Sequence, residues 1–287
     1  MNKGILLVLS GYLMWGCFPL YWALLNHVNP SEVLIHRMLW AVPVLFFLVH
    51  FKASWKNNFK DSLSSKKELV FLFITAILIT INWGGYIYAV NLGRVVEASM
   101  GYFLSPVINM IGGYIFFQER ISKLKQLAVF LATVGALYYV FSGDSFPWLG
   151  FLVGFTFSAY GIARKAMASS AVPGLYIETL ILLPFLLIFS LWFYTNYDVA
   201  FFNINISTDI LLFLAGAVTV LPLALFTAGT KLLPLTTVGI LFLITPTIQF
   251  LVGYYLQNEP VNSNQLIGFV GVWAGLLIYS YALVKNK

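Results

Sequence analysis

Charged residues are scarce in this sequence. Asp, Glu, Lys and Arg make up only 9% of the 287 residues, whereas soluble domains carry about 25%. A chain with so little charge cannot cover a water-facing surface, which excludes a soluble globular protein. The net charge of +6 is carried by cations that lie between apolar runs, so nucleic acid is not an expected partner. The single cysteine, Cys17, excludes an internal disulfide.

The sequence also lacks the short motifs of common catalytic and energy-coupling sites. It contains no G-x4-G-K-[ST] phosphate loop, so no ATP-driven motor lies in this chain. Neither H-E-x-x-H nor G-x-S-x-G occurs, and the three histidines are not in ligand spacing with one another. We therefore expect no enzyme, no metal site and no cofactor.

Long apolar runs dominate what remains, because 60% of the residues are hydrophobic. Runs of about 17–22 residues match a hydrocarbon core of about 30 Å, and a backbone in lipid must satisfy its own hydrogen bonds, which predicts helices. The runs do not alternate as the strands of a membrane barrel would. The sequence predicts an all-α integral membrane protein with ten transmembrane helices, near 4–25, 33–51, 69–90, 97–117, 124–141, 148–167, 175–194, 210–228, 237–257 and 264–284.

The positions of the cations predict the orientation. If the N-terminus is cytoplasmic, 14 of the 16 Lys and Arg residues fall in cytoplasmic segments, and only Arg37 and Arg94 fall on the other side. The positive-inside rule then places both termini in the cytoplasm.

The sequence repeats itself after 140 residues. Ser105-Pro106 falls on Thr245-Pro246, Asn109 on Gln249, and Glu119 on Glu259. The unit contains five predicted helices, an odd number, so the second copy enters the membrane from the opposite face. We therefore predict two inverted five-helix repeats, residues 1–143 and 144–287. Such inverted repeats are typical of secondary transporters, in which a solute binds near the middle of the membrane between the repeats.

Polar residues form matching stripes in the fourth and ninth helices. Tyr102, Pro106 and Asn109 share one helical face, and the equivalent ninth-helix residues include Pro246 and Gln249. Proline bends a helix and frees a carbonyl. The stripes therefore line a cavity or, alternatively, tie kinked helices together.

Polar and aromatic residues of three further helices fit the same cavity. Asn82 and Tyr86 share a face of the third helix, Trp15 lies midway along the first, and Tyr160 midway along the sixth. Aromatic rings at mid-membrane depth suit a flat or partly apolar solute. Core packing remains the alternative for each ring.

Charged residues inside the spans are candidates for gates or coupling sites. His36 and Arg37 lie near the outer end of the second helix, and His36 is suited to titrate near neutral pH. Glu178, the counterpart of Arg37 at an offset of 141, lies near the inner end of the seventh helix. Charges inside a membrane are expected to have partners, and we predict Arg37 with Glu97 outside and Glu178 with Arg164 or Lys231 inside. Snorkelling to the nearby interface is the alternative.

Two further patterns are interpreted as structural. Glu119 and Glu259 precede plausible N-caps, where an acid accepts free helix N–H groups. Small residues at four-residue spacing predict close helix packing: Ala128, Ala132 and Ala136 in the fifth helix, Gly271 and Gly275 in the tenth.

Several segments resemble a known family. Glu119-x6-Gln126-x8-Gly135 and Glu259-x5-Gln265-x2-Gly268-x6-Gly275 are similar to the ends of paired EamA domains in the drug/metabolite transporter superfamily. Segments that resemble its RarD-like branch are Trp15-Gly16-x2-Pro19, Glu32-x3-His36-Arg37-x2-Trp40, Asn82-Trp83, Glu97-Ala98-Ser99-x-Gly101-Tyr102 and Glu178-Thr179. The resemblance implies a ten-helix carrier of the bacterial inner membrane, with a central cavity built from both halves. It does not supply a substrate.

The function predicted from the sequence is secondary transport, by alternating access, of a small organic metabolite or drug-like amphiphile, directed outward. The expected partners are the lipid bilayer and a small-molecule substrate; one chain holds both repeats, so a monomer suffices, although a homodimer is compatible. The alternatives are an intramembrane lipid-modifying enzyme and a lipid-translocating or sensor protein. The predicted substrate-binding residues are Trp15, Asn82, Tyr86, Tyr102, Asn109, Tyr160 and Gln249, and the gate or coupling candidates are His36, Arg37, Glu97, Arg164 and Glu178.

Overall fold

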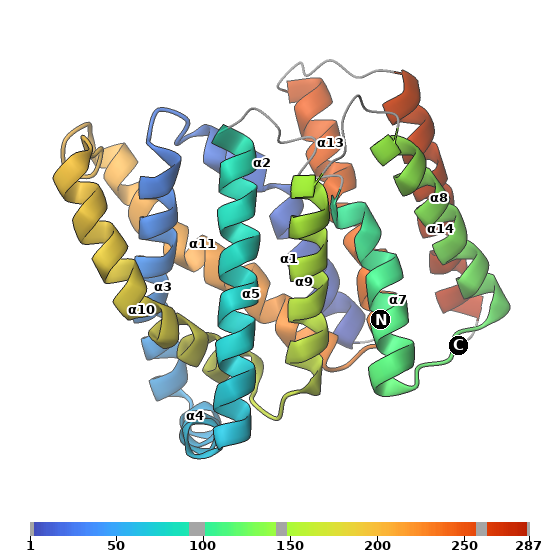
Figure 1. Cartoon of the computed structure of the whole chain (residues 1–287), viewed down its shortest axis with the longest axis horizontal. Helices are drawn as coiled ribbons and strands as arrows, with labels where there is room; N and C mark the ends of the chain where they lie inside the picture. The colour runs from blue at the N-terminus through green and yellow to red at the C-terminus, as the bar shows by residue number, and fades with distance from the viewer. Residues whose placement is uncertain (1–2, 92–100, 142–147, 257–262, 286–287) are drawn as a thin grey trace.

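The computed structural model describes residues 3–91, 101–141, 148–256 and 263–285 of the chain. Within these ranges every regular element is a helix and there is no strand (Figure 1). The helices are α1 (Lys3–Gly16), α2 (Phe18–Ala23), α3 (Pro30–Phe51), α4 (Ala53–Ser64), α5 (Lys66–Asn91), the 3-10 helix η1 (Tyr102–Leu104), α7 (Ser105–Phe117), α8 (Lys123–Phe141), α9 (Trp148–Ala166), α10 (Ala171–Asn196), α11 (Ile206–Thr230), α12 (Leu235–Phe242), α13 (Ile244–Leu256) and α14 (Ser263–Lys285).

The predicted all-helical membrane fold is confirmed. Each of the predicted apolar runs contains helix, and seven segments of the described chain are long and apolar enough to cross a membrane. Many large apolar side chains on their outer faces are exposed, as lipid contact requires.

Helix α4 was not predicted. It carries Lys56 and Lys60 on its exposed surface, whereas Trp55 and Phe59 pack against the hydrophobic core. A segment with one polar face and a short apolar face is typical of a helix lying along a membrane surface. Its charge explains why a search for apolar runs misses it.

Three of the helical segments are broken close to a proline. The first breaks at Cys17, two residues before Pro19, and the ninth at Leu243, three residues before Pro246. In the fourth, Pro106 lies in the first turn of α7, just after η1. Proline lacks the N–H that would bond to the fourth carbonyl before it, so the regular helical hydrogen bonding is interrupted at each of these points.

Helices that are equivalent under the 140-residue offset run in opposite directions. In Figure 1, α3 runs from the upper end of the molecule down to α4, whereas α10 begins at that lower end and runs upward. Their contacts are also paired, because α1 packs against α11 and α9 packs against α5. This arrangement agrees with two inverted repeats.

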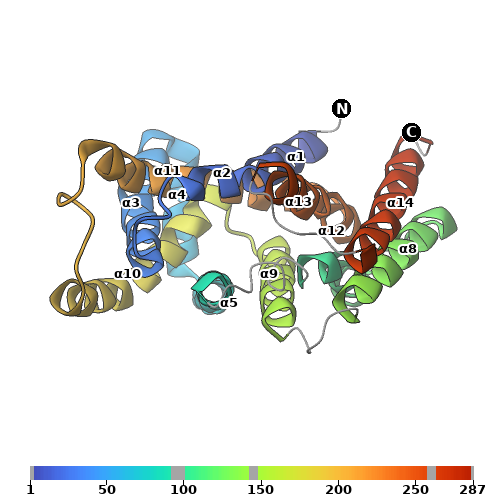
Figure 2. The same cartoon turned by 90° about the horizontal axis from the view of Figure 1, so that it is seen from above.

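The close packing predicted at the small residues of α8 and α14 is confirmed, and the structure shows that these two helices pack against each other. Ala128, Ala132 and Ala136 have no exposed surface, and a Cβ atom added at Gly275 would lie 2.5 Å from the carbonyl oxygen of Ala128. The absence of side chains at these points lets the two backbones approach closely. Figure 2 shows the pair together at one edge of the molecule.

Candidate functional site

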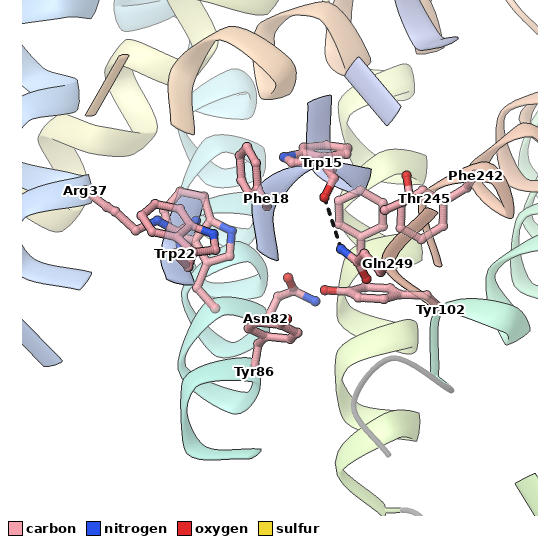
Figure 3. A pocket seen from close by; sticks show the side chains of 12 residues that line it. Trp15, Phe18, Trp22, Arg37, Asn82, Tyr86, Tyr102, Phe242, Thr245 and Gln249 are labelled. Carbon is pink, nitrogen blue, oxygen red and sulfur yellow. Dashed lines mark hydrogen bonds between the residues drawn. The ribbon is translucent and has the colours of Figure 1, made fainter. Parts of the chain in front are cut away.

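A pocket lies in the centre of the molecule, between helices from both halves of the sequence (Figure 3). It has an empty volume of about 600 Å³, part of it open to solvent. We call it the aromatic pocket, because eight of its twelve lining side chains are aromatic. The lining residues are Trp15, Phe18, Trp22, Arg37, Asn82, Trp83, Tyr86, Tyr102, Phe157, Phe242, Thr245 and Gln249.

Gln249 binds a carbonyl that Pro19 has freed. In an uninterrupted helix the N–H of residue 19 would bond to the carbonyl of Trp15, but proline has no N–H. The amide nitrogen Nε2 of Gln249 donates to that carbonyl at 3.1 Å instead (Figure 3). The other end of the amide, Oε1, is buried and has no hydrogen-bond partner among the described residues. An unfilled acceptor therefore lies at the pocket wall.

Asn82 joins two helices below the pocket. Its Nδ2 atom donates to the Val153 carbonyl at 2.7 Å and contacts the Thr156 hydroxyl oxygen at 3.3 Å, which ties α5 to α9. The hydroxyl of Tyr102 points toward the Asn82 side chain, and Tyr86 lies on the same side of the pocket (Figure 3). Asn82 thus has a structural role as well as a place in the lining.

Arg37 is the cation of the pocket lining. Its guanidinium carbon lies 4.7 Å from the centroid of Trp22 and 5.2 Å from that of Trp83, and its Nε donates to the Thr219 hydroxyl at 3.1 Å. Contacts with two indole faces stabilise a guanidinium that has left water. No carboxylate of the described residues lies within ion-pair distance of Arg37.

The floor of the pocket is a cluster of packed rings. Phe157 stacks on Phe242 and on Phe226 with centroid distances of 4.9 and 5.0 Å, and Trp15 meets the edge of Phe157 at 5.4 Å. Contacts of this kind hold rings in fixed orientations. The floor is therefore rigid and apolar.

A second polar site, which we call the Glu178 cluster, consists of Thr75, Tyr160, Arg164 and Glu178. The Glu178 carboxylate accepts from the Thr75 hydroxyl at 2.5 Å, from the Tyr160 hydroxyl at 3.2 Å and from Arg164 Nη1 at 3.4 Å. Arg164 has no exposed surface and Glu178 is 3% exposed. Of the two partners predicted for Glu178, Arg164 is the one observed.

The Glu178 cluster and the aromatic pocket lie toward opposite ends of the molecule. Glu178 lies two turns into α10, which begins at the lower end in Figure 1. Arg37 lies two turns into α3, which begins at the upper end beside α2. The cluster joins α5, α9 and α10 below the pocket.

Further bonds close the lower end around residues 167–171. Arg164 Nη2 donates to the Ser170 and Ala171 carbonyls, and the Glu68 carboxylate accepts the N–H groups of Ala168 and Ser169. Lys231 donates to the Met167 and Ser169 carbonyls. Burial, aided by the positive charge of Arg164 and opposed by Glu68, lowers the pKa of Lys231 to about 8. The segment between α9 and α10 is thus held from three sides.

Glu119 caps a helix, but not the next one along the chain. Its Oε1 accepts the N–H of Leu235 at 2.9 Å, at the start of α12, and pairs with Lys165 Nζ at 2.8 Å. The capping role predicted for Glu119 is confirmed, but the predicted helix is wrong, because the N–H group that Glu119 accepts belongs to α12, against which α7 packs, and not to α8. Glu259 lies outside the described residues.

Five of the predicted substrate-binding residues line the aromatic pocket: Trp15, Asn82, Tyr86, Tyr102 and Gln249. Two do not. Asn109 is buried between α7 and α12, where a Cβ atom added at Gly239 would meet its side chain at 2.9 Å. Tyr160 belongs to the Glu178 cluster.

The predicted gate residues also separate. Arg37 lies in the pocket lining, and its expected partner Glu97 lies outside the described residues. His36 is buried and bonded at both ring nitrogens, to Tyr194 and to Trp40 at 2.9 Å each. These bonds give His36 a place in a packed network between α3 and α10.

Several lining residues were not selected from the sequence, among them Trp22, Trp83 and Thr245. Trp83 directly follows Asn82, and Thr245 precedes Pro246. A polar or aromatic residue beside a helix-breaking proline was an available signal for Thr245. No sequence signal places Trp22 against Arg37, because that contact depends on the turn between α2 and α3.

Comparisons with known proteins agree with one another. A model of the EamA-like transporter family matches residues 2–141. The chain is 37% identical to the uncharacterized transporter YojE of Bacillus subtilis (strain 168), over 100% of this chain and 96% of that protein. It is 34% identical to Protein RarD of Escherichia coli (strain K12), over 97% of this chain and 94% of that one. One crystal structure, 12% identical in sequence, shares the fold with a TM-score of 0.72 over 96% of both chains.

Proposed function

The chain belongs to the EamA-like transporter family, in its RarD-like branch, and from this membership we propose that it is a secondary transporter. It carries a small organic metabolite or drug-like amphiphile across the bacterial inner membrane by alternating access, in the outward direction. Both termini are then cytoplasmic, as the distribution of Lys and Arg indicates. It binds its solute without converting it, so it is not an enzyme.

One observation carries the proposal. The aromatic pocket is lined by residues of both halves: Trp15, Arg37 and Asn82 come from the first, Phe242 and Gln249 from the second. A site between two inverted units is accessible from either side when one unit rocks against the other. Amide and hydroxyl groups in this position need water or a solute, because lipid cannot satisfy them.

The Glu178 cluster is a candidate for the gate on the cytoplasmic side of the pocket. It joins α5, α9 and α10 through a buried ion pair and two hydroxyl groups. Separating a buried ion pair while its two charges stay buried is unfavourable, since each charge alone is then poorly solvated. It therefore favours two states, closed with the pair made and open with both groups in water. The equivalent gate on the other side would involve Arg37 and Glu97.

The experiment is flux in proteoliposomes. Wild-type protein is reconstituted and challenged with a mixture of small metabolites, with and without a pH gradient, and both compartments are analysed by mass spectrometry. We expect solutes to redistribute unchanged. A solute that is converted but does not move would indicate an enzyme, and scrambling of labelled lipid alone would indicate a lipid-translocating protein.

Two substitutions test whether the solute uses the aromatic pocket. Gln249→Leu removes an amide from the pocket wall, whereas Asn109→Leu changes the equivalent position of the other repeat, which lies outside the lining. We expect Gln249→Leu to lower the flux by at least about tenfold, as losing a buried polar contact to a solute does. The pocket assignment is abandoned if Gln249→Leu transports at the wild-type rate.

A further inference from the structure

We propose that the aromatic pocket selects flat aromatic anions that carry a hydrogen-bond donor at the end opposite the anionic group. The inference rests on the proposed transport function and specifies its substrate class. It follows from three features of the pocket: a cation at one side, an unfilled acceptor at the other, and aromatic walls between them.

The cation is Arg37. Its Nε is used by Thr219, and its two terminal nitrogens have no hydrogen-bond partner among the described residues. A guanidinium that presents two parallel N–H groups suits a carboxylate, which accepts both. The guanidinium carbon lies over the ring of Trp22 and over the ring of Trp83, and Arg37 lines the pocket. The described lining residues include no carboxylate, so Arg37 is the charged side chain among them.

The acceptor is Oε1 of Gln249. The bond from Nε2 to the Trp15 carbonyl fixes which way the amide faces. Oε1 is then left buried and without a partner among the described residues. A buried acceptor without a donor is unfavourable, so a ligand hydroxyl or N–H at this point is stabilised. In Figure 3, Arg37 and Gln249 lie at opposite sides of the pocket.

The walls select a flat ring. Trp15, Tyr86, Tyr102, Phe157 and Phe242 are among the aromatic side chains that line the pocket. Aromatic surroundings favour an aromatic ligand by stacking and edge contacts over a saturated ligand of equal size.

The same features disfavour other ligand classes. An organic cation would face Arg37 without a compensating carboxylate among the described lining residues. A sugar would leave most of its hydroxyl groups against aromatic carbon, where they have no hydrogen-bond partner. A purely apolar ligand would leave both Arg37 and Gln249 Oε1 unused.

The test is equilibrium binding to the purified full-length protein, by isothermal titration calorimetry at pH 7, with five related probes. The reference probe is 4-hydroxyphenylacetate, which has an anion, a ring and a donor. Phenylacetate lacks the donor, cyclohexylacetate lacks the aromatic ring, 4-hydroxyphenylacetamide lacks the charge, and tyramine reverses it. We expect the reference probe to bind most tightly and tyramine at least about tenfold more weakly, the ratio expected for a charge-assisted contact. Tyramine or the neutral amide binding as tightly as the reference overturns the proposal.

Variants assign the two ends of the ligand. In Arg37→Gln the reference probe should bind at least about tenfold more weakly, whereas the neutral amide changes by less than about threefold. Arg37→Lys keeps the charge but not the two parallel N–H groups, so it should keep the preference for anions and bind the reference probe more weakly than wild type; this variant tests the proposal if Arg37→Gln does not fold. Gln249→Leu should remove the preference for 4-hydroxyphenylacetate over phenylacetate and leave the preference for anions. Lys60→Gln, an equal loss of charge on the exposed face of α4, should bind all probes as wild type. Unchanged anion preference in Arg37→Gln, or wild-type affinity for the reference probe in Arg37→Lys, places the ligand elsewhere and overturns the proposal.

A separate counterflow measurement distinguishes this inference from the transport proposal. Vesicles loaded with unlabelled reference probe are placed in labelled probe. Anion-selective binding without counterflow supports the proposed ligand class and counts against the transport proposal. Counterflow of tyramine in preference to the reference probe supports the transport proposal and overturns the proposed ligand class.

Discussion

Replacing Glu178 by Gln tests whether the Glu178 cluster depends on its charge. The amide keeps the shape of the side chain and can still accept from Thr75 and Tyr160, but Arg164 loses its counter-ion while having no exposed surface. Removing one partner of a buried ion pair costs about 3–5 kcal/mol. Because Arg164 keeps two backbone carbonyls as acceptors, we expect the lower end, about 3 kcal/mol. At about 2–4 °C per kcal/mol, the melting temperature should fall by about 6–12 °C.

The assay is thermal unfolding of purified protein in one detergent, followed by tryptophan fluorescence. Asp61→Asn is the matched control, since it removes a carboxylate from the exposed surface of α4 and should shift the melting temperature by less than about 2 °C. The double variant Glu178→Gln/Arg164→Met removes both charges and should recover part of the loss. The reasoning is refuted if Glu178→Gln has the same melting temperature as Asp61→Asn. It is also refuted if the double variant loses more stability than the two single variants lose together.

Three further predictions concern stability. A Cβ atom on Gly154 would lie 2.0 Å from the Gly101 carbonyl oxygen, so Gly154→Ala should destabilise the protein by at least about 1–3 kcal/mol. Gly84→Ala is the control, because a Cβ atom there meets nothing within 4 Å. It should be neutral or slightly stabilising in the same unfolding assay. Glu32 is fully buried and accepts two backbone N–H groups of the α10–α11 loop; Glu32→Ala should cost about 2–3 kcal/mol and raise proteolysis in that loop, and unchanged cleavage would contradict this role. The pKa of Lys231 is lowered to about 8 in the folded protein, whereas the ordinary lysine pKa is about 10.4. Between these two pH values the unfolded chain therefore binds more protons than the folded one, so the stability of the wild type relative to Lys231→Met should rise with pH. A difference in melting temperature that does not change with pH would contradict this prediction.

Hydropathy predicts most of this fold, because each membrane-spanning helix must be apolar over its full length. Four-residue spacing of small residues also predicts that α8 and α14 each pack closely against another helix, because such packing needs only an absence of large side chains. It does not predict that they pack against each other, which the structure shows. Helix α4 escapes this approach because only one face of it is apolar. The break at Cys17 escapes it as well, because a single proline near a helix end does not by itself distinguish a bend from an interruption.

The candidate site is predictable in part. Periodicity shows that Tyr102 and Asn109 share a helical face, but it does not show what that face meets. The 3-10 turn at η1 separates them, so that Tyr102 reaches the pocket while Asn109 packs against Gly239. The place of Arg37 between Trp22 and Trp83 depends on three elements at once. No local pattern in the sequence predicts a contact that depends on three separate elements.

The contact between α8 and α14 limits how the protein can move. Besides each other, these two helices contact η1, α7, α12 and α13 of the described chain. Large side chains such as Phe130 and Leu277 face outward. Glycine and alanine have no rotamers to exchange, so the paired backbones cannot slide a little and repack. When the pocket rearranges, α8 and α14 must therefore move together as one rigid pair. The relative motion of helices must occur at contacts formed by long side chains. A cross-link placed within the pair should therefore leave turnover intact, while one placed across α5 and α10 should stop it.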